Sequence, residues 1–254
     1  MSGTRAEIVK LARLLAEDPA RFDYLADLPP ADVRAVRIAA TDVLFDANAD
    51  VFARIAAASK LVPSAITAAI AERAFGPLLC ARVAAALEPD RAVDLAARVS
   101  VDFLADVAAE IDPRRIAPIL TALPVTRMRA VATVLIRRGD YVTMGSFIGE
   151  LPTPALRALV AELSAEDMLH TAVFSDDDSR FPEIFAMVPD TKVAEVVQFA
   201  ATAEDPFATD VFTVLTHLDA AGRARLAEEV DKLSEEDRST IATRAAAVGM
   251  TDFV

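Results

Sequence analysis

The stretch IDPRRIAPILTALPVTRMRAVATVLI, from Ile111 to Ile136, contains the pattern that decides the fold. At four, seven, eight and eleven residues after Pro124 stand Met128, Val131, Ala132 and Leu135. This spacing places apolar side chains on one stripe of an α-helix. Proline is accepted in the first turn of a helix, because the N–H that it lacks would have no partner there. The stretch therefore predicts a short helix that begins next to a proline.

The same pattern recurs along the chain. It follows Pro152 with Leu156, Leu159, Val160 and Leu163, and it follows Pro189 with Val193, Val196, Val197 and Ala200. After Pro29 it is interrupted once, by Arg37, and shifted versions follow Pro89 and Pro113. Pairs of such helices give a unit of about 24 residues, which is typical of stacked helical hairpins. We predict an all-α protein with the architecture of a right-handed α-solenoid of the armadillo or superhelical type.

Polar residues beside the prolines predict where the helices begin. Asp18, Asp112, Thr153 and Asp205 precede prolines and are predicted caps, and Ser164 with Asp167 and Ser234 with Asp237 resemble capping boxes. We predict a helical-repeat solenoid over residues 1–173, an acidic loop over 174–180 and a helical continuation over 181–254 that includes capping helices. The alternative is one continuous domain.

The joints of the quoted stretch and of the repeat that follows it also carry a resemblance to known families. Leu123-Pro124, Leu151-Pro152 and Asp112-Pro113 lead short helices into one another. In this respect the chain resembles the superhelical N-terminal domain of the MgtE magnesium channel family. It also resembles the armadillo-like repeats of the flagellar motor switch protein FliG. The resemblance covers residues 85–165 best, implies a stacked helical fold and an interaction role, and provides no site residue.

Charge and composition narrow the classes of function. The net charge of −13 disfavours nucleic-acid binding, which needs a basic surface. The single cysteine, Cys80, is typical of a reducing cytosol. Because uncharged apolar runs stay short of the ~18–20 residues that a membrane span needs, we expect no membrane insertion. The usage of Ala, Arg, Asp and Val favours a bacterial source, and we expect a cytoplasmic protein.

One stretch with a different composition is RRGDYVTMGSFIGEL, from Arg137 to Leu151. Gly139 stands where a helix ends and Asp140 where the next begins, so we interpret the stretch as a helix-turn-helix. It lacks the lysine of a phosphate-binding loop. The residues of this stretch that are predicted to face a binding groove are Tyr141, Thr143, Met144 and Phe147.

Titratable residues give little indication of an active site. Asp176, Asp177 and Asp178 form an acidic run without the turn glycine and distal Glu of a calcium loop, so we expect an exposed, solvated loop that contacts a partner at most. His170 and His217 fit no metal motif, and Cys80 stands in an apolar helix as a small buried residue. We therefore expect no catalytic residue, no metal site, no cofactor and no enzymatic activity.

Two functions remain open from the sequence. The first is a scaffold or adaptor that binds another protein through a solenoid surface, with a homodimer as one form. The second is a binder of an apolar small molecule or lipid in a groove between helices. Charges are few in residues 62–87 and 116–134, which predicts that these segments form either a buried seam or a homodimer face.

Overall fold

The computed structural model describes residues 2–205 and 207–250, and within these ranges the protein is helical, without strands. This confirms the predicted all-α class. The chain forms two compact units: unit 1 contains residues 1–35 and 156–254, and unit 2 contains residues 36–155. Residues 174–180, the predicted acidic loop, lie inside unit 1. None of the described helices combines the length and apolar character that a bilayer crossing requires.

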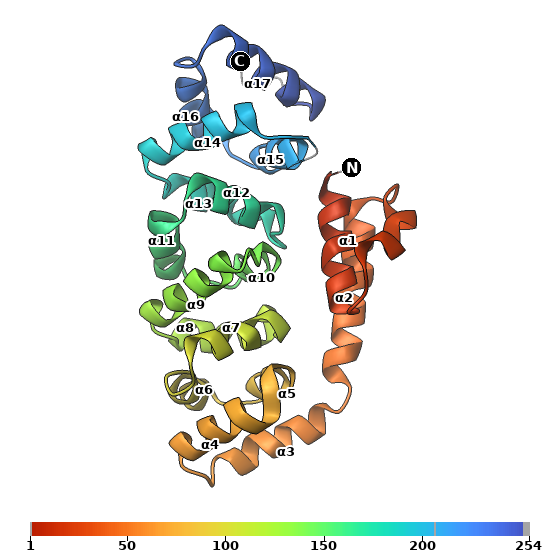
Figure 1. The fold of residues 1–254 in the computed structure, drawn as a ribbon, viewed down its shortest axis with the longest axis vertical. Coiled ribbons are helices and arrows are strands. Elements are labelled where there is room, and N and C mark those ends of the chain that lie inside the picture. Colours follow the sequence, from red (N-terminus) through yellow and green to blue (C-terminus); the bar gives the residue numbers. More distant parts are fainter. Residues whose placement is uncertain (1, 206, 251–254) are drawn as a thin grey trace. The chain divides into compact units, whose positions relative to one another are not determined.

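Unit 2 consists of short helices stacked in two rows (Figure 1). Its elements are the end of α2 (Pro30–Asp46), α3 (Ala49–Ser59), α4 (Ser64–Ile70), the π-helix η2 (Ala71–Phe75), α5 (Gly76–Ala84), α6 (Pro89–Ala96), α7 (Val101–Glu110), η3 (Pro113–Ile116), α8 (Ala117–Ala122), α9 (Val125–Arg137) and α10 (Tyr141–Phe147). One row packs α3, α5, α7 and α9 in succession, and the other packs α4, α6 and α8. This is the arrangement of stacked hairpins that the repeat predicted, while its handedness stays a prediction.

Unit 1 joins the beginning of the chain to its last hundred residues. Its elements are α1 (Ser2–Leu14), η1 (Pro19–Leu25), the start of α2, α11 (Thr153–Glu162), α12 (Ala165–Val173), η4 (Asp178–Arg180), α13 (Phe181–Ala186), α14 (Asp190–Thr202), α15 (Phe207–Leu215), α16 (Ala220–Val230) and α17 (Glu235–Ala247). Helices α12, α14 and α16 form one row, whereas α15 packs against α12, α17 and the N-terminal α1. The first helix therefore belongs with the C-terminal helices.

Prolines and small polar caps start the helices, as predicted. Pro124 and Pro189 are the N-cap residues of α9 and α14, and Pro89 is in the first turn of α6. Asp18 and Asp112 accept hydrogen bonds from backbone N–H groups. Ser164 and Ser234 accept from the N–H of Asp167 and Asp237 and donate to their carboxylates, which confirms both capping boxes. Thr153 is the first residue of α11, and its capping role, like that of Asp205, stays a prediction.

A second kind of contact, which the sequence did not predict, ties five helices (α6, α9, α14, α16 and α17) to an earlier helix of the same unit. In each case a basic side chain of the later helix donates to carbonyl groups at, or just after, the C-terminal end of the earlier helix. The examples are Arg91 on Ser59 and Val62, Arg127 on Ala96 and Val99, Lys192 on Val160, Ala161 and Leu163, Arg225 on Phe185 and Val188, and Arg244 on Ala200, Ala201 and Ala203. These carbonyls have no partner inside their own helix, and cations are favoured at that end of the helix dipole.

Candidate interaction surface

The residues predicted to line a groove lie on α10, the helix after Gly139. Gly139 has a φ of +67°, and Asp140 accepts hydrogen bonds from the N–H and hydroxyl of Thr143 at 3.1 and 2.8 Å. This geometry confirms the helix-turn-helix interpretation. Thr143 and Met144 are buried, Tyr141 is half-buried, and Phe147 packs on the core cluster of Ala92, Ile116, Ile119 and Leu120. A groove contact of these four side chains stays a prediction.

The acidic run does not form the solvated loop that its sequence predicted. Ser175 is buried, and Asp176, Asp177 and Asp178 are half-buried. The ammonium group of Lys10 donates to the Asp176 carboxylate at 2.8 Å and to the Ser175 carbonyl at 3.2 Å. Asp177 caps η4 through the N–H of Ser179. The expectation of an exposed loop is therefore wrong for Ser175 and Asp176, because a cation from the first helix neutralises the turn.

Lys10 belongs to a buried ion network inside unit 1. Its ammonium group also donates to Glu7 at 2.9 Å, and Arg34 of α2 donates to the same Glu7 oxygen at 3.0 Å and to the Asp176 carbonyl at 3.2 Å. Burial by itself lowers the pKa of Arg34, but the charge and hydrogen bond of Glu7, together with the charges of Asp178 and Asp176, outweigh it, and the net shift is upward. The feature of the sequence that could have indicated this network is a charged pair, Glu7 and Lys10, beside the apolar Ile8 and Leu11. The network holds α1 in place and contains no nucleophile.

The other titratable candidates pack beside apolar or aromatic groups. Cys80, which was expected to be buried, is half-buried, as is His170, and His217 is exposed. The His170 ring stacks on Phe207 with centroids 4.0 Å apart, and burial lowers the pKa of His170. His217 lies 3.8 Å from Asp178. Burial raises the pKa of the Cys80 thiol to about 11, so this thiol is protonated at neutral pH and is a poor nucleophile. Among the described residues, no cluster of three or more His, Cys, Asp or Glu side chains is arranged to hold a metal ion.

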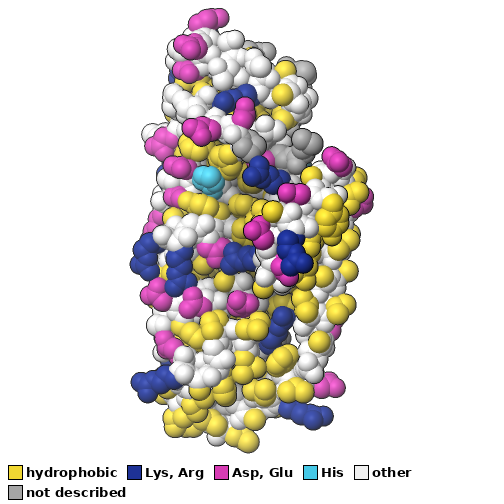
Figure 2. Space-filling view, turned by 45° about the vertical axis from the view of Figure 1, so that its right-hand side comes forward, with side chains coloured by type: hydrophobic (Ala, Val, Ile, Leu, Met, Phe, Trp, Pro, Cys, Tyr) yellow, Lys and Arg dark blue, Asp and Glu magenta, His cyan; other side chains and the backbone are white. Residues whose placement is uncertain are grey.

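The most unusual feature of the surface is where large apolar side chains are exposed. Within the described ranges, every large hydrophobic side chain that is exposed lies between Leu15 and Leu78. Nine of them belong to unit 2, and we name this set the α2–α5 surface. Its members are Val36, Val43, Leu44, Val51, Leu61, Ile66, Ile70, Phe75 and Leu78. Figure 2 shows hydrophobic side chains gathered at the lower end of the molecule, where Figure 1 places α3, α4 and α5.

The helices below this surface bury very little. Helices α3, α4 and α5 each bury a single residue, which is Ala56 in α3, Ala68 in α4 and Ala81 in α5. In contrast, α9 buries Met128, Ala132, Val134 and Leu135. Of the two segments predicted as a seam or a dimer face, residues 116–134 bury Ile116, Ile119, Leu120, Met128 and Val134, whereas residues 62–87 include four of the exposed side chains. Exposed apolar patches of this kind mark interaction sites.

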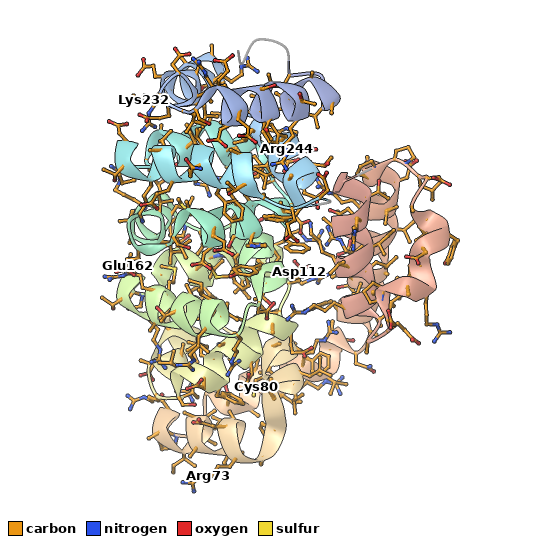
Figure 3. The ribbon with its side chains drawn as sticks, turned by 45° about the horizontal axis from the view of Figure 1, so that its top comes forward. Arg73, Cys80, Asp112, Glu162, Lys232 and Arg244 are labelled. Carbon is orange, nitrogen blue, oxygen red and sulfur yellow. The ribbon has the colours of Figure 1, made fainter. Side chains whose placement is uncertain are left out.

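The α2–α5 surface also has no net charge, and ion pairs and a cation–π contact join the end of α2 to later helices. Residues 36–78 contain four basic and four acidic residues and so have no net charge, although the whole chain carries −13. At the end of α2, the Phe45 ring lies 3.5 Å from the Arg82 guanidinium, and Arg115 donates to Asp46 at 2.8 Å. Arg114 and Arg115 both also bind the buried Asp112, which is labelled in Figure 3. These contacts hold the end of α2, on which Val43 and Leu44 are exposed.

Comparison with known proteins adds no assignment. No protein family, curated protein or solved structure matches the chain.

Proposed function

We propose that this protein is a non-enzymatic scaffold or adaptor, and that it binds a protein through the α2–α5 surface. The observation that carries the proposal is that, among the described residues, the exposed large apolar side chains all lie within residues 15–78. A protein that buries its apolar side chains elsewhere and leaves a cluster uncovered on rigid helices has the features of an interface. The resemblance to MgtE and FliG helical domains also supports an interaction role. We place this role in the cytosol.

A binder of an apolar small molecule or lipid is the second candidate, because the same side chains would suit an apolar ligand. The two candidates differ in what they predict at the surface. A protein partner covers side chains from several helices at once, whereas a small ligand needs a concave site that encloses most of it.

Site-specific photo-crosslinking in the cells of origin tests the proposal. A benzophenone amino acid replaces Leu61 or Leu78 on the surface, and Ala161 on α11 serves as the exposed control position. We expect protein crosslinks from the two surface positions and not from the control. Absence of protein crosslinks at both surface positions contradicts the proposal. Native mass spectrometry of the gently purified protein then tests the second candidate. A small bound mass that leaves on denaturation would support it.

A further inference from the structure

From the α2–α5 surface we infer that the protein it binds is a second copy of this chain, with the α3 helices of the two copies packed antiparallel about a two-fold axis. This inference rests on the proposed function and specifies its partner. Three observations carry it: the area of the surface, its charge, and the order of side chains on the outer face of α3.

The exposed area matches what a dimer needs from each copy. The nine side chains are between 41% and 87% exposed. With roughly 150–200 Å² for a fully exposed large apolar residue, they present about 800 Å², which is close to the ~800 Å² that each partner contributes to a stable interface. Short helices are marginal in water without packing, so α3 and α4 gain most from being covered.

Charge favours a second copy over a basic or acidic partner. Two chains of net charge −13 repel each other wherever their acidic surfaces meet. Residues 36–78 are neutral, so this surface is where two copies approach with the least repulsion. A basic partner would instead be attracted to the acidic remainder of the chain, and an acidic partner would gain nothing from a neutral surface.

The outer face of α3 is complementary to itself. Asp50, Arg54, Ala57 and Ala58 follow the spacing of one helix face and are all exposed. Within the described part of the chain, Asp50 and Arg54 have no ion-pair partner. An antiparallel neighbour related by a two-fold axis beside residue 52 brings Asp50 of each copy opposite Arg54 of the other. The small side chains of Ala57 and Ala58 allow close approach, and a two-fold interface requires this kind of reciprocal pairing.

The test is a charge exchange on the full-length protein, read by sedimentation velocity and native mass spectrometry. We expect the wild-type chain to be a dimer at micromolar concentration. In either variant, Asp50→Arg or Arg54→Asp, residues 50 and 54 carry the same charge and lie opposite each other at two places in the dimer. Each substitution should therefore weaken dimerisation at least 10-fold. An equimolar mixture of the two variants should recover a dimer that contains one of each. Glu195→Arg, the same charge change on an exposed position of α14, should leave the dimer unchanged.

Several outcomes would overturn the inference. A wild-type chain that stays monomeric up to about 100 μM, far above the Kd of ordinary standard-size interfaces, overturns it. So does a dimer that Asp50→Arg, verified as folded by circular dichroism, leaves intact. A mixture without mixed dimers overturns the antiparallel pairing. If Leu61 crosslinks to a protein of another mass while the chain is monomeric, the proposed function stands and only this inference fails.

Discussion

Helices α1 and α3 are of similar length, but their burial is the opposite of what their composition suggests. α1 (SGTRAEIVKLARL) contains four charged residues, and α3 (ADVFARIAAAS) contains two. Yet the more polar helix is the buried one: Thr4, Ala6, Glu7, Ile8, Lys10, Leu11 and Ala12 are all buried, whereas α3 buries only Ala56. Apolar composition therefore does not decide which of the two helices is covered.

The difference teaches that burial depends on which partners the fold brings to a helix. For α1 the fold supplies Asp176 and Arg34, which pair with Lys10 and Glu7, and α15 packs against the same helix. For α3 the fold supplies α5 on one side and leaves the opposite side open. The charged first helix is therefore an internal element of unit 1.

The largest expected effect comes from breaking the network that buries α1. Glu7→Ala removes the carboxylate shared by Lys10 and Arg34, and we expect it to lower the free energy of unfolding by about 3–5 kcal/mol, since a buried charge is left underpaired. Glu17→Ala, which removes the exposed partner of Arg21, should change it by less than about 0.5 kcal/mol. Urea denaturation followed by circular dichroism measures both. Equal effects of the two substitutions would show that the network does not hold α1.

A matched pair of leucines compares the covered and uncovered surfaces directly. Leu226 of α16 is 0% exposed and Leu61 is 87% exposed. Leu226→Ala should cost about 2–5 kcal/mol through the lost contacts and the cavity, and Leu61→Ala less than about 0.5 kcal/mol. Both are measured in the Asp50→Arg background, so that dimerisation does not contribute. A cost of several kcal/mol for Leu61→Ala would mean that the monomer itself covers this side chain.

A smaller effect is expected where a polar contact compensates for the sparse packing of α3. Arg91 donates to the carbonyls of Ser59 and Val62 at 2.6 and 2.8 Å, at the C-terminal end of α3. Arg91→Met should destabilise the protein by about 1–3 kcal/mol, because those carbonyls lose their donor. Hydrogen exchange should accelerate mainly in α3 and α4. Arg98→Met, which removes an exposed pair with Asp94, is the control and should leave exchange in α3 unchanged.

The smallest effect is the pH dependence of stability that comes from Cys80. This residue is half-buried in α5, whereas Phe75 and Leu78, close to it in sequence, are exposed. Its pKa is raised from 9.0 to about 11 by burial. Between these values the unfolded thiol loses its proton while the folded thiol keeps it, so stability falls as the pH rises from 9 to 11. Cys80→Ser should remove that part of the pH dependence. The check is the urea midpoint of both proteins at pH 7 and pH 10, and an identical pH dependence would contradict the burial of the thiol.

Much of the local structure was predictable from single residues. Pro124 and Pro189 beside helix starts, Gly139 and Asp140 at a joint, and the capping boxes of Ser164 and Ser234 all follow from local backbone chemistry. The buried stripe after Pro189 also appears as predicted, because the helix repeat fixes which side chains share a face. The stripe after Pro29 shows the limit, since Val33 is buried but Val36 is exposed.

The candidate surface was predictable only in part. Low charge marked residues 62–87 and 116–134 alike, yet the first segment includes four exposed large apolar side chains, and the second contributes Ile116, Ile119 and Leu120 to a buried cluster. The ion pairs of Lys10 with Asp176 and the contacts of Arg91 with Ser59 link residues far apart in sequence, and no local pattern announces them.

The sequence by itself determined the helices, their starts and their apolar faces, because these depend on interactions within a few residues. Only the tertiary structure decided which faces are covered, because a helix face is buried by whatever the rest of the chain places against it. Helix α1 met counter-charges and was buried, while α3 packs on α5 through one side and leaves its other side, with Val51, in water.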